Sequence, residues 1–231
     1  MPVATLVIAH RGASAEKPEN SIAAFRRALA LKVDGIELDV QVTADGVPVV
    51  FHDAHLRRLT GRPGRVTNHT WRKLKKLRLA GSEPIPRLAD VLALVRGRAL
   101  VQIELKRGAT VIPVVRAIRR ARAERWVILA SFEAKLVREA GKLAPAIPRM
   151  LISAGRGGAK RLLRQMAAAG ASGLSLHYKA VRNRATVQAL HAGGAILWCW
   201  TVNDGATARR LAGWGVDALL GDNPDLLRSR V

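Results

Sequence analysis

Charged and titratable side chains follow or interrupt three apolar runs in this 231-residue sequence. The run LVIA is followed at once by His10 and Arg11. The run GIELDV carries Glu37 and Asp39, and the run LVQIEL carries Glu104. Because side chains alternate between the two faces of a strand, a spacing of two places Glu37 and Asp39 on one face. The chain has only 17 acidic residues, so carboxylates inside apolar strands are not expected to serve as solubilising charge.

Three carboxylates that converge on one water-poor site would repel one another and take up protons unless a positive group joins them. A hard divalent cation, Mg²⁺ or Ca²⁺, suits a site made only of carboxylate oxygens, and no thiolate cluster indicates zinc. Glu37, Asp39 and Glu104 are therefore candidate metal ligands. The alternative is a buried ion-pair network, in which Arg11 and Lys106 balance the carboxylates.

Two histidines accompany this cluster. His10 ends the first apolar run, and His52 ends the segment VPVVFH. A histidine with its ordinary pKa of about 6.5 both accepts and donates protons near neutral pH. Two histidines beside a metal ion, with Arg11 and Lys106 available for an anion, meet the needs of phosphodiester hydrolysis. One histidine would help to deprotonate the nucleophile and the other would protonate the leaving alkoxide.

Alternating strand and helix patterns supply the framework for these residues. Strands are predicted at 5–9, 35–40, 100–105, 126–132, 149–153, 173–177, 195–202 and 217–221. Helices are predicted at 21–32, 88–96, 110–123, 133–144, 159–170, 183–194, 205–215 and 225–230, with Asn20, Thr110 and Asn203 as N-caps. Eight strands that each precede a helix predict an α/β fold, a (β/α)8 TIM barrel, in which active sites lie at the carboxyl ends of the strands. A doubly wound open sheet is the alternative, but no GxGxxG follows the first strand.

One segment interrupts the alternation. An Asp-Gly turn joins GIELDVQV to VPVVFHD, which predicts a β-hairpin. Residues 44–87 are therefore expected to form a small insertion between the second strand and its helix. A hairpin folded over the barrel mouth would bring His52 near Asp39. No linker or repeat divides the chain, so residues 1–231 are expected to form one domain.

The net charge limits the classes of partner. The chain has 39 Lys and Arg against 17 Asp and Glu, a formal charge of +22, which favours nucleic acid, a phospholipid surface or a phosphate-bearing substrate. No run approaches the ~18 apolar residues of a membrane helix, and the N-terminal segment lacks the pattern of a signal peptide. Together with a single cysteine, Cys199, these features predict a cytoplasmic protein.

Several motifs, taken together, resemble those of the glycerophosphodiester phosphodiesterases. They run in order along the chain: AHRG (9–12), PENS (18–21), ELDVQVTADGVPVVFHD (37–53), PIPRLADVL (84–92), IELK (103–106), SF (131–132) and WTVN (200–203). The resemblance implies a (β/α)8 barrel with an insertion after its second strand. It also implies metal-dependent hydrolysis of glycerophosphodiesters to glycerol 3-phosphate and an alcohol, in phospholipid and glycerol metabolism.

The same resemblance assigns roles to individual residues. It implies that the acid–base pair is His10 and His52, and that one Mg²⁺ or Ca²⁺ is bound by Glu37, Asp39 and Glu104. It implies phosphate contacts for Arg11 and Lys106, and a place in the wall of the substrate pocket for Trp200. His177 ends another predicted strand at the same face and is a weaker candidate for substrate contact.

Three alternatives stay open. The same site could act on lysophospholipids in the manner of a lysophospholipase D, or use a hydroxyl of the substrate and release a cyclic phosphate. The third alternative is a basic nucleic-acid-binding protein, which is a binding protein and not an enzyme. It explains the charge but not the cluster of carboxylates and histidines, and the sequence lacks a basic patch interleaved with aromatic residues. No nucleic-acid partner is therefore expected.

The insertion contains a strongly basic segment. Residues 54–80 include nine basic residues and no acidic one. Within TWRKLKKLRL, a spacing of three separates Trp71, Leu74 and Leu77, which predicts a short basic helix with an apolar stripe. Either this stripe packs onto the barrel, or it lies on an anionic membrane surface, where each basic residue would add about 1 kcal/mol.

Overall fold

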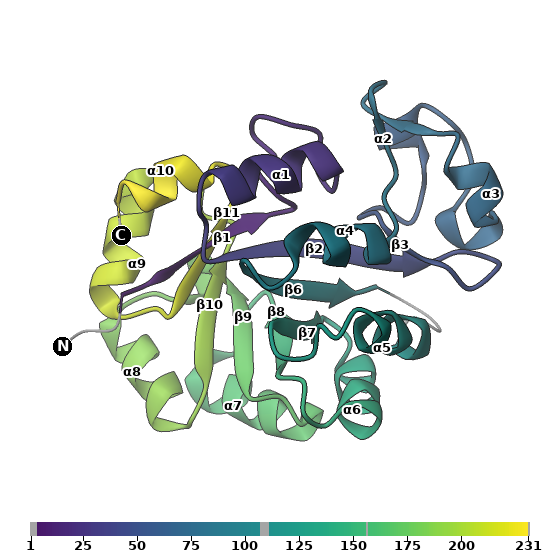
Figure 1. Ribbon diagram of the computed structural model, residues 1–231. Coiled ribbons are helices and arrows are strands. Elements are labelled where there is room, and N and C mark those ends of the chain that lie inside the picture. Colours follow the sequence, from purple (N-terminus) through teal and green to yellow (C-terminus); the bar gives the residue numbers. More distant parts are fainter. Residues whose placement is uncertain (1–3, 107–110, 156, 231) are drawn as a thin grey trace.

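Eight parallel strands close into a barrel in the computed structural model, which describes residues 4–106, 111–155 and 157–230 (Figure 1). Around the barrel they are β1 (Leu6–His10), β2 (Gly35–Val42), β6 (Leu100–Leu105), β7 (Val127–Ser131), β8 (Arg149–Ser153), β9 (Gly173–His177), β10 (Ile196–Trp200) and β11 (Ala218–Gly221). The pairing of β1 with both β11 and β2 closes the ring. The predicted TIM barrel is confirmed, and the open-sheet alternative is excluded.

Helices cover the outside of the barrel (Figure 1). They are α1 (Ile22–Ala30), α4 (Leu88–Val95), α5 (Val111–Arg120), α6 (Ala134–Leu143), α7 (Gly158–Ala169), α8 (Arg184–Ala192), α9 (Gly205–Trp214) and α10 (Pro224–Arg228), with a 3₁₀ turn at Tyr178–Ala180. Each predicted strand and helix has its counterpart, with ends that differ by a few residues. No helix among the described residues has the length and apolar character needed to cross a membrane.

Two of the predicted helix caps are wrong by one residue. Ser21 caps α1 and Asp204 caps α9, because their side-chain oxygens accept hydrogen bonds from backbone amides of the first turn. The preceding residues, Asn20 and Asn203, do not cap these helices. Thr110, the third predicted cap, lies outside the described residues.

Strand alternation separates an outer apolar layer from the barrel interior. On β2, Ile36, Leu38 and Val40 are fully buried in the cluster formed with the covering helices. Glu37 and Asp39 point to the other side, into the barrel. This is the arrangement that a spacing of two predicts for a strand.

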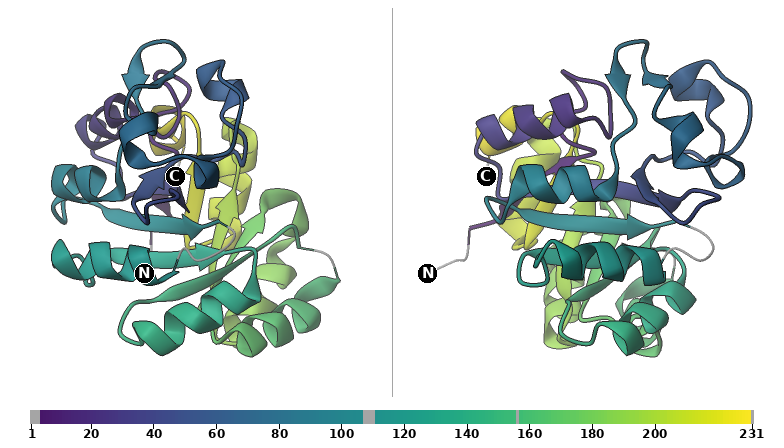
Figure 2. Two further views of the ribbon diagram at one scale, coloured as in Figure 1. Left: turned by 90° about the vertical axis from the view of Figure 1, so that its right-hand side faces the viewer. Right: turned by 45° about the vertical axis from the view of Figure 1, so that its right-hand side comes forward.

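The predicted insertion lies between β2 and α4. It contains β3 (Pro48–Val50), antiparallel to β2, then α2 (Arg57–Thr60), a 3₁₀ turn (Val66–Asn68), α3 (Trp71–Leu74), β4 (Arg78–Leu79) and β5 (Glu83–Pro84). Both views of Figure 2 place it on the same side of the barrel as α1. It has a small apolar core of its own, made by Val49, Phe51, Leu56, Val66, Leu74, Leu79 and Ile85.

The basic helix predicted within TWRKLKKLRL is shorter than expected. Only Trp71–Leu74 is α-helical, because the chain turns at Lys75 and enters β4, where the side chain of Leu79 joins the core of the insertion. Leu74 is fully buried in that core, and Trp71 and Leu77 pack against it. The apolar stripe is therefore internal to the insertion.

Candidate active site

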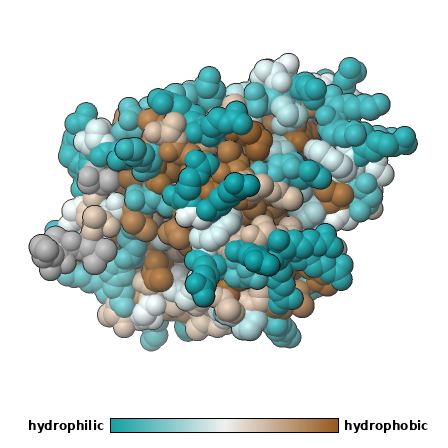
Figure 3. Space-filling view, viewed as in Figure 1, coloured by the Kyte–Doolittle hydropathy of each residue, from teal (hydrophilic) through white to brown (hydrophobic). Residues whose placement is uncertain are grey.

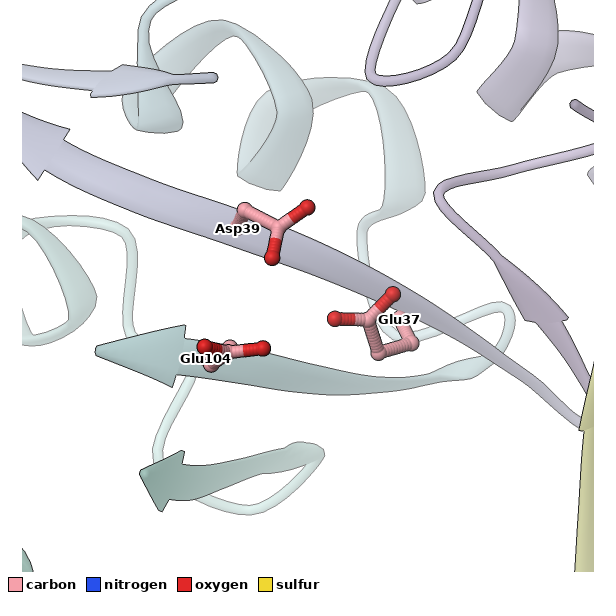
Figure 4. Close-up of side chains that lie close together, drawn as sticks. All are labelled: Glu37, Asp39 and Glu104. Carbon is pink, nitrogen blue, oxygen red and sulfur yellow. The ribbon is translucent and has the colours of Figure 1, made fainter. Parts of the chain in front are cut away.

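Three carboxylates meet at the mouth of the barrel. Glu37 and Asp39 lie on β2 and Glu104 on β6, where Asp39 and Glu104 are partners in the strand register. One oxygen from each lies within 4.8 Å of the others, and all three side chains point toward one another in Figure 4. The structure thus brings together the three residues proposed from the sequence as metal ligands.

Burial and mutual repulsion govern the protonation of this cluster. Burial, together with the neighbouring Asp39 carboxylate, raises the pKa of Glu37 to about 8 and that of Glu104 to about 7. Burial also acts to raise the pKa of Asp39. The charges of Lys106 and Arg11 outweigh it and hold that pKa below its usual range. The site therefore favours one firmly ionised carboxylate flanked by two that require further positive charge to ionise.

Two cationic side chains lie against the carboxylates. The ammonium nitrogen Nζ of Lys106 is 2.9 Å from Asp39 Oδ1 and 2.5 Å from Glu104 Oε1. Arg11 Nε is 3.3 Å from Asp39 Oδ2, and the backbone amide of Arg11 donates to Glu37 Oε2 at 3.1 Å. Arg11 and Lys106 thus both lie against the carboxylates, as the sequence predicts. They form the buried ion pairs that were the alternative to a metal site.

His10 is held by a carboxylate from the last strand of the barrel. Its Nδ1–H donates to Asp222 Oδ1 at 2.7 Å, and Nε2 lies 3.9 Å from Glu37 Oε2. Asn203 Nδ2 donates to the second oxygen of Asp222 at 2.6 Å, while Ser14 Oγ donates to the first at 3.1 Å. Burial acts to lower the pKa of His10, but the bond to Asp222 and the charge of Glu37 raise it above its ordinary value.

His52 is held in the same manner by the residue that follows it. Its Nδ1–H donates to Asp53 Oδ1 at 2.7 Å, which leaves Nε2 for the cavity. Arg58 of α2 donates to both oxygens of Asp53, at 2.6 and 2.8 Å, and to Glu19 at 2.7 Å. Burial lowers the pKa of His52 below its ordinary value, and the charge of Lys106 adds to this effect.

A single amide fixes the backbone that carries His52. Gln41 of β2 is buried, and its Nε2 donates to the carbonyls of Phe51 and Asp53, at 2.9 and 2.6 Å. The backbone amide of Phe51 donates to the carbonyl of Asp39 at 2.9 Å. As predicted, the hairpin brings His52 to the level of Asp39.

The segment PENS (18–21) supports the site from the loop between β1 and α1. Glu19 accepts a hydrogen bond from Arg11 Nη1 at 2.8 Å. Asn20 is fully buried, and its Nδ2 donates to Asp39 Oδ2 at 2.8 Å. Ser21 then caps α1. Each polar residue of this segment therefore orients either a site residue or the helix that follows.

A cavity of about 120 Å³ lies among these residues. One side is polar, with His10, His52 and the carboxylates of Glu37 and Glu104; the other side is mostly apolar and includes Trp200. Trp200 Nε1 donates to the carbonyl of Ser175 at 2.9 Å, which fixes its indole.

Three aromatic rings extend the apolar wall of the cavity. Phe132 and His177 each make an edge-to-face contact with Trp200, with ring centroids 5.7 and 5.1 Å apart. Phe132 is half exposed, so this wall continues from the cavity to the surface. The geometry gives His177 a place behind Trp200 and not among the residues that line the cavity.

Five further polar residues complete the site, and none of them was assigned a role in it from the sequence: Asp222, Asp53, Glu19, Asn20 and Asn203. Four of them lie inside the motifs HD, PENS and WTVN, so the family resemblance already marked their positions as candidates for the site. Asp222 directly follows β11 at the carboxyl end of a strand, which is the other signal that could have identified it.

Comparisons with known proteins identify the family of the chain. The model of the glycerophosphoryl diester phosphodiesterase family matches residues 10–226. A glycerophosphodiester phosphodiesterase of Caldanaerobacter subterraneus is 36% identical over 96% of this chain and 96% of its own length.

Solved structures show the same fold. A glycerophosphodiester phosphodiesterase of Agrobacterium tumefaciens superposes with a TM-score of 0.85 at 29% identity, over 97% of this chain and 99% of that one. A phosphodiesterase of Oleispira antarctica, solved with the product sn-glycerol 3-phosphate, superposes with a TM-score of 0.90 at 26% identity, over 98% and 96%. The chain therefore belongs to the glycerophosphoryl diester phosphodiesterase family.

Proposed function

We propose that the protein hydrolyses glycerophosphodiesters to glycerol 3-phosphate and an alcohol, with the aid of a divalent cation. The observation that supports this most strongly is the convergence of three carboxylates and two carboxylate-paired histidines on one small cavity. Metal ligands, an acid–base pair and cations for an anionic substrate are the components that phosphodiester hydrolysis uses.

The donor set suits Mg²⁺ or Ca²⁺. Glu37, Asp39 and Glu104 offer only carboxylate oxygens, which are the ligands of hard cations. When all three are ionised, their charge exceeds that of Arg11 and Lys106 by one unit. Burial, together with the charge of Asp39, raises the pKa values of the two glutamates. When bound, a divalent cation would reverse the sign of the net charge and polarise a phosphoryl oxygen, which complements a phosphodiester.

The histidines are arranged for proton transfer at their Nε2 atoms. Asp222 and Asp53 each accept the Nδ1 proton of one histidine, which selects the tautomer with a free Nε2 and fixes the ring. In our proposal one ring deprotonates the attacking hydroxyl and the other protonates the departing alkoxide.

Arg11 and Lys106 would hold the phosphate. Both side chains are 19% exposed and so are largely screened from water. Arg11 lines the cavity, and Lys106 lies beside it, against Asp39 and Glu104. In a site of this kind a fixed guanidinium and an ammonium stabilise the charge that develops on the phosphoryl oxygens. Trp200 would limit the opposite wall and favour a compact glycerol group beside the phosphate.

Product analysis tests the proposal directly. The metal-stripped protein is incubated in H₂¹⁸O with glycerophosphodiesters of different alcohols and with a lysophospholipid, before and after addition of Mg²⁺ or Ca²⁺. We expect glycerol 3-phosphate that carries ¹⁸O, only after metal addition, in ³¹P NMR spectra. Release of a cyclic phosphate would identify a substrate hydroxyl as the nucleophile, and a lack of turnover with all substrates and metals would refute the proposal.

A substrate with an activated leaving group separates the two histidine roles. With p-nitrophenol in place of the natural alcohol, the leaving group departs without protonation. The variant that lacks the acid should therefore regain activity on this substrate, while the variant that lacks the base should stay inactive. If neither His10→Ala nor His52→Ala regains activity, the division of labour is wrong.

We also propose a cytoplasmic location, in contact with anionic membranes. The nine basic residues between positions 54 and 80 are all exposed. Since Trp71, Leu74 and Leu77 pack within the insertion, such contact would be electrostatic and would involve no apolar insertion into the bilayer. Cell fractionation tests the location. Sedimentation with anionic and neutral vesicles tests the contact, which the change of Arg72, Lys73, Lys75 and Lys76 to Gln should abolish.

A further inference from the structure

A groove of about 980 Å³ lies between α4 and α5, on the outer wall of the barrel. It runs from the β2–β3 turn at Gly46 to the loop before β7 at Trp126. Small side chains leave space between the two helices: Ala89 and Ala93 from α4, and Ala117 from α5. Both helices lie on the face drawn in Figures 1 and 3. In Figure 3 hydrophilic side chains cover these two helices, with apolar atoms between them.

Arginines surround this groove. Those that line it are Arg87, Arg96, Arg116, Arg120 and Arg122, and no lysine lines it. Four of them, Arg96, Arg116, Arg120 and Arg122, are exposed, and their side chains make no hydrogen bond or ion pair within residues 4–106, 111–155 and 157–230. Four positive charges therefore face one concave surface without an ion-pair partner among the described residues.

Other arginines on or beside these two helices do find partners. On α5, Arg119 donates to the carbonyl of Leu143 at 2.6 Å. Next to α4, Arg98 donates to the carbonyl of Leu94 at 2.6 Å, and Arg87 pairs with Asp90 at 2.6 Å. Arg87 lines the groove but is paired, so the arginines of the groove that lack a partner are Arg96, Arg116, Arg120 and Arg122.

One acidic residue lines the groove, and its single charge offsets only part of the charge of the four arginines. Asp45 lies at one end, where its Oδ1 accepts a hydrogen bond from Thr43 Oγ1 at 2.6 Å and another from the backbone amide of Trp71 at 2.9 Å. These two hydrogen bonds stabilise the β2–β3 turn and tie it to the start of α3. The opposite end is closed by Trp126, whose indole is partly exposed and packs beside Gly97.

We propose that the groove binds a single strand of nucleic acid, with its phosphates against the arginines. Guanidinium groups match phosphate oxygens in a bidentate manner, and the floor of small side chains leaves room for a thin chain. The partly exposed indole of Trp126 offers a surface on which a base can stack. Ten residues of α5 extend about 15 Å, so the groove holds a few nucleotides at a time.

Other occupants fit less well. A bilayer surface is flat and does not enter a groove between two helices. A second copy of this chain also carries a formal charge of +22 and would be repelled. The proposal revises the expectation that no nucleic acid binds, because two helices and a loop assemble in space a basic patch with an aromatic residue that is not contiguous in the sequence. It does not depend on the catalytic function proposed above.

Fluorescence anisotropy with a labelled 15-nucleotide oligothymidylate tests the proposal, in EDTA so that metal-dependent cleavage is suppressed. The groove variant changes Arg96, Arg116, Arg120 and Arg122 to Gln. The matched control removes the same charge from the insertion, with Arg72, Lys73, Lys75 and Lys76 changed to Gln. A third variant, Ala93→Leu with Ala117→Leu, fills the groove and keeps every charge. Thermal unfolding checks that all three are folded.

We expect the groove variant to bind at least tenfold more weakly, and the filled variant to lose affinity without any loss of charge. If four phosphate contacts are lost, the slope of log K against log salt should fall by about 3 in the groove variant. The insertion variant should bind the oligonucleotide as the wild type does. Equal losses in the groove and insertion variants, or no loss in the filled variant, would show that oligonucleotide binding depends only on the total charge of the protein. Either result would overturn the proposal.

Two competition experiments discriminate against other partners. Polyglutamate of equal charge should displace the oligonucleotide poorly, and the groove variant should sediment with anionic vesicles as the wild type does. Displacement by polyglutamate at the same concentration of charge would assign the groove to an acidic protein. Loss of vesicle binding in the groove variant would assign it to a membrane. Either result would refute a nucleic-acid site.

Discussion

The two halves of the barrel interior differ in composition and in purpose. Around β2 and β6 the interior is built from Glu37, Asp39, Gln102 and Glu104. Around β7 to β11 it is an apolar cluster that includes Ala130, Met150, Ile152, Trp198 and Leu220, joined by Ile8 of β1. Both halves are equally buried, so burial alone does not separate them.

The two halves differ in what makes the burial of their side chains favourable. Apolar side chains gain free energy when they leave water, whereas each carboxylate requires a partner charge or hydrogen bond. Those partners come from outside β2 and β6: the loop that contains Asn20, the β1 terminus at Arg11 and the residue Lys106. We therefore expect substitutions in the charged half to change activity, and substitutions in the apolar half to change stability.

The largest effect is expected from Glu37→Gln. Loss of one candidate metal ligand should remove several kcal/mol of transition-state stabilisation and thereby lower kcat/KM about 10³-fold or more. Because burial disfavours the ionised glutamate, the free energy of unfolding in EDTA should not fall. Steady-state kinetics with added metal and urea unfolding in EDTA measure the two quantities. Activity within threefold of wild type would remove Glu37 from the metal site.

His10→Ala and His52→Ala are each expected to lower kcat by about 10²–10⁴-fold, the usual contribution of general acid–base catalysis. His55→Ala is the matched control, because His55 is exposed and lies three residues after His52 on the same loop. The control should retain full activity. If it is as damaging as His52→Ala, the loop conformation matters and no acid–base role for His52 is supported.

In the apolar half, Trp198→Ala should act on stability alone. Trp198 is buried within the interior cluster, so its truncation should lower the free energy of unfolding by about 3–5 kcal/mol. The folded fraction should keep a kcat close to that of the wild type. Urea unfolding, with kinetics at low temperature, provides the measurement. A kcat loss as large as that of His10→Ala would contradict the division between the halves.

Asp222→Asn should have a smaller effect on catalysis than loss of the His10 ring. The asparagine keeps the shape but no longer favours the His10 tautomer with a free Nε2, so kcat should fall about tenfold or more. Its pH–rate profile should shift as well, since the hydrogen bond to Asp222 raises the pKa of His10. An unchanged pH profile would show that Asp222 has only a structural role.

The smallest expected effect is on acid stability. Burial acts to raise the pKa of Asp222, but its hydrogen bond from His10 outweighs burial and lowers this pKa to about 2. A carboxyl whose pKa is lowered on folding stabilises the protein above its ordinary pKa near 4, and this contribution is lost as the pH falls toward 2. Asp222→Asn should therefore show a flatter loss of stability between pH 4 and pH 2 in urea titrations. An identical slope would argue against the lowered pKa.

Periodicity predicted most of the fold and the centre of the site. The spacing of two at Glu37 and Asp39, and the end of β1 at His10, follow from alternation and from the position of active sites in such barrels. The supporting residues were harder to predict. Asn20 was interpreted as a helix cap by its residue type, but Ser21 caps the helix and Asn20 contacts Asp39. Local preference cannot choose between these neighbours, because the choice depends on a carboxylate 19 residues away.

Gln41 has a consequence for how this enzyme family could be engineered. Its amide holds the backbone at Phe51 and Asp53, and Val50 N is fixed by the carbonyl of Pro86 at 2.8 Å. The backbone that carries His52 is therefore fixed before the chain enters the insertion and again where it returns. The intervening segment, 54–85, is therefore expected to be exchangeable under two conditions. A graft must supply apolar side chains that cover Val49 and Phe51, and it must offer Asp53 and Glu19 a partner in place of Arg58.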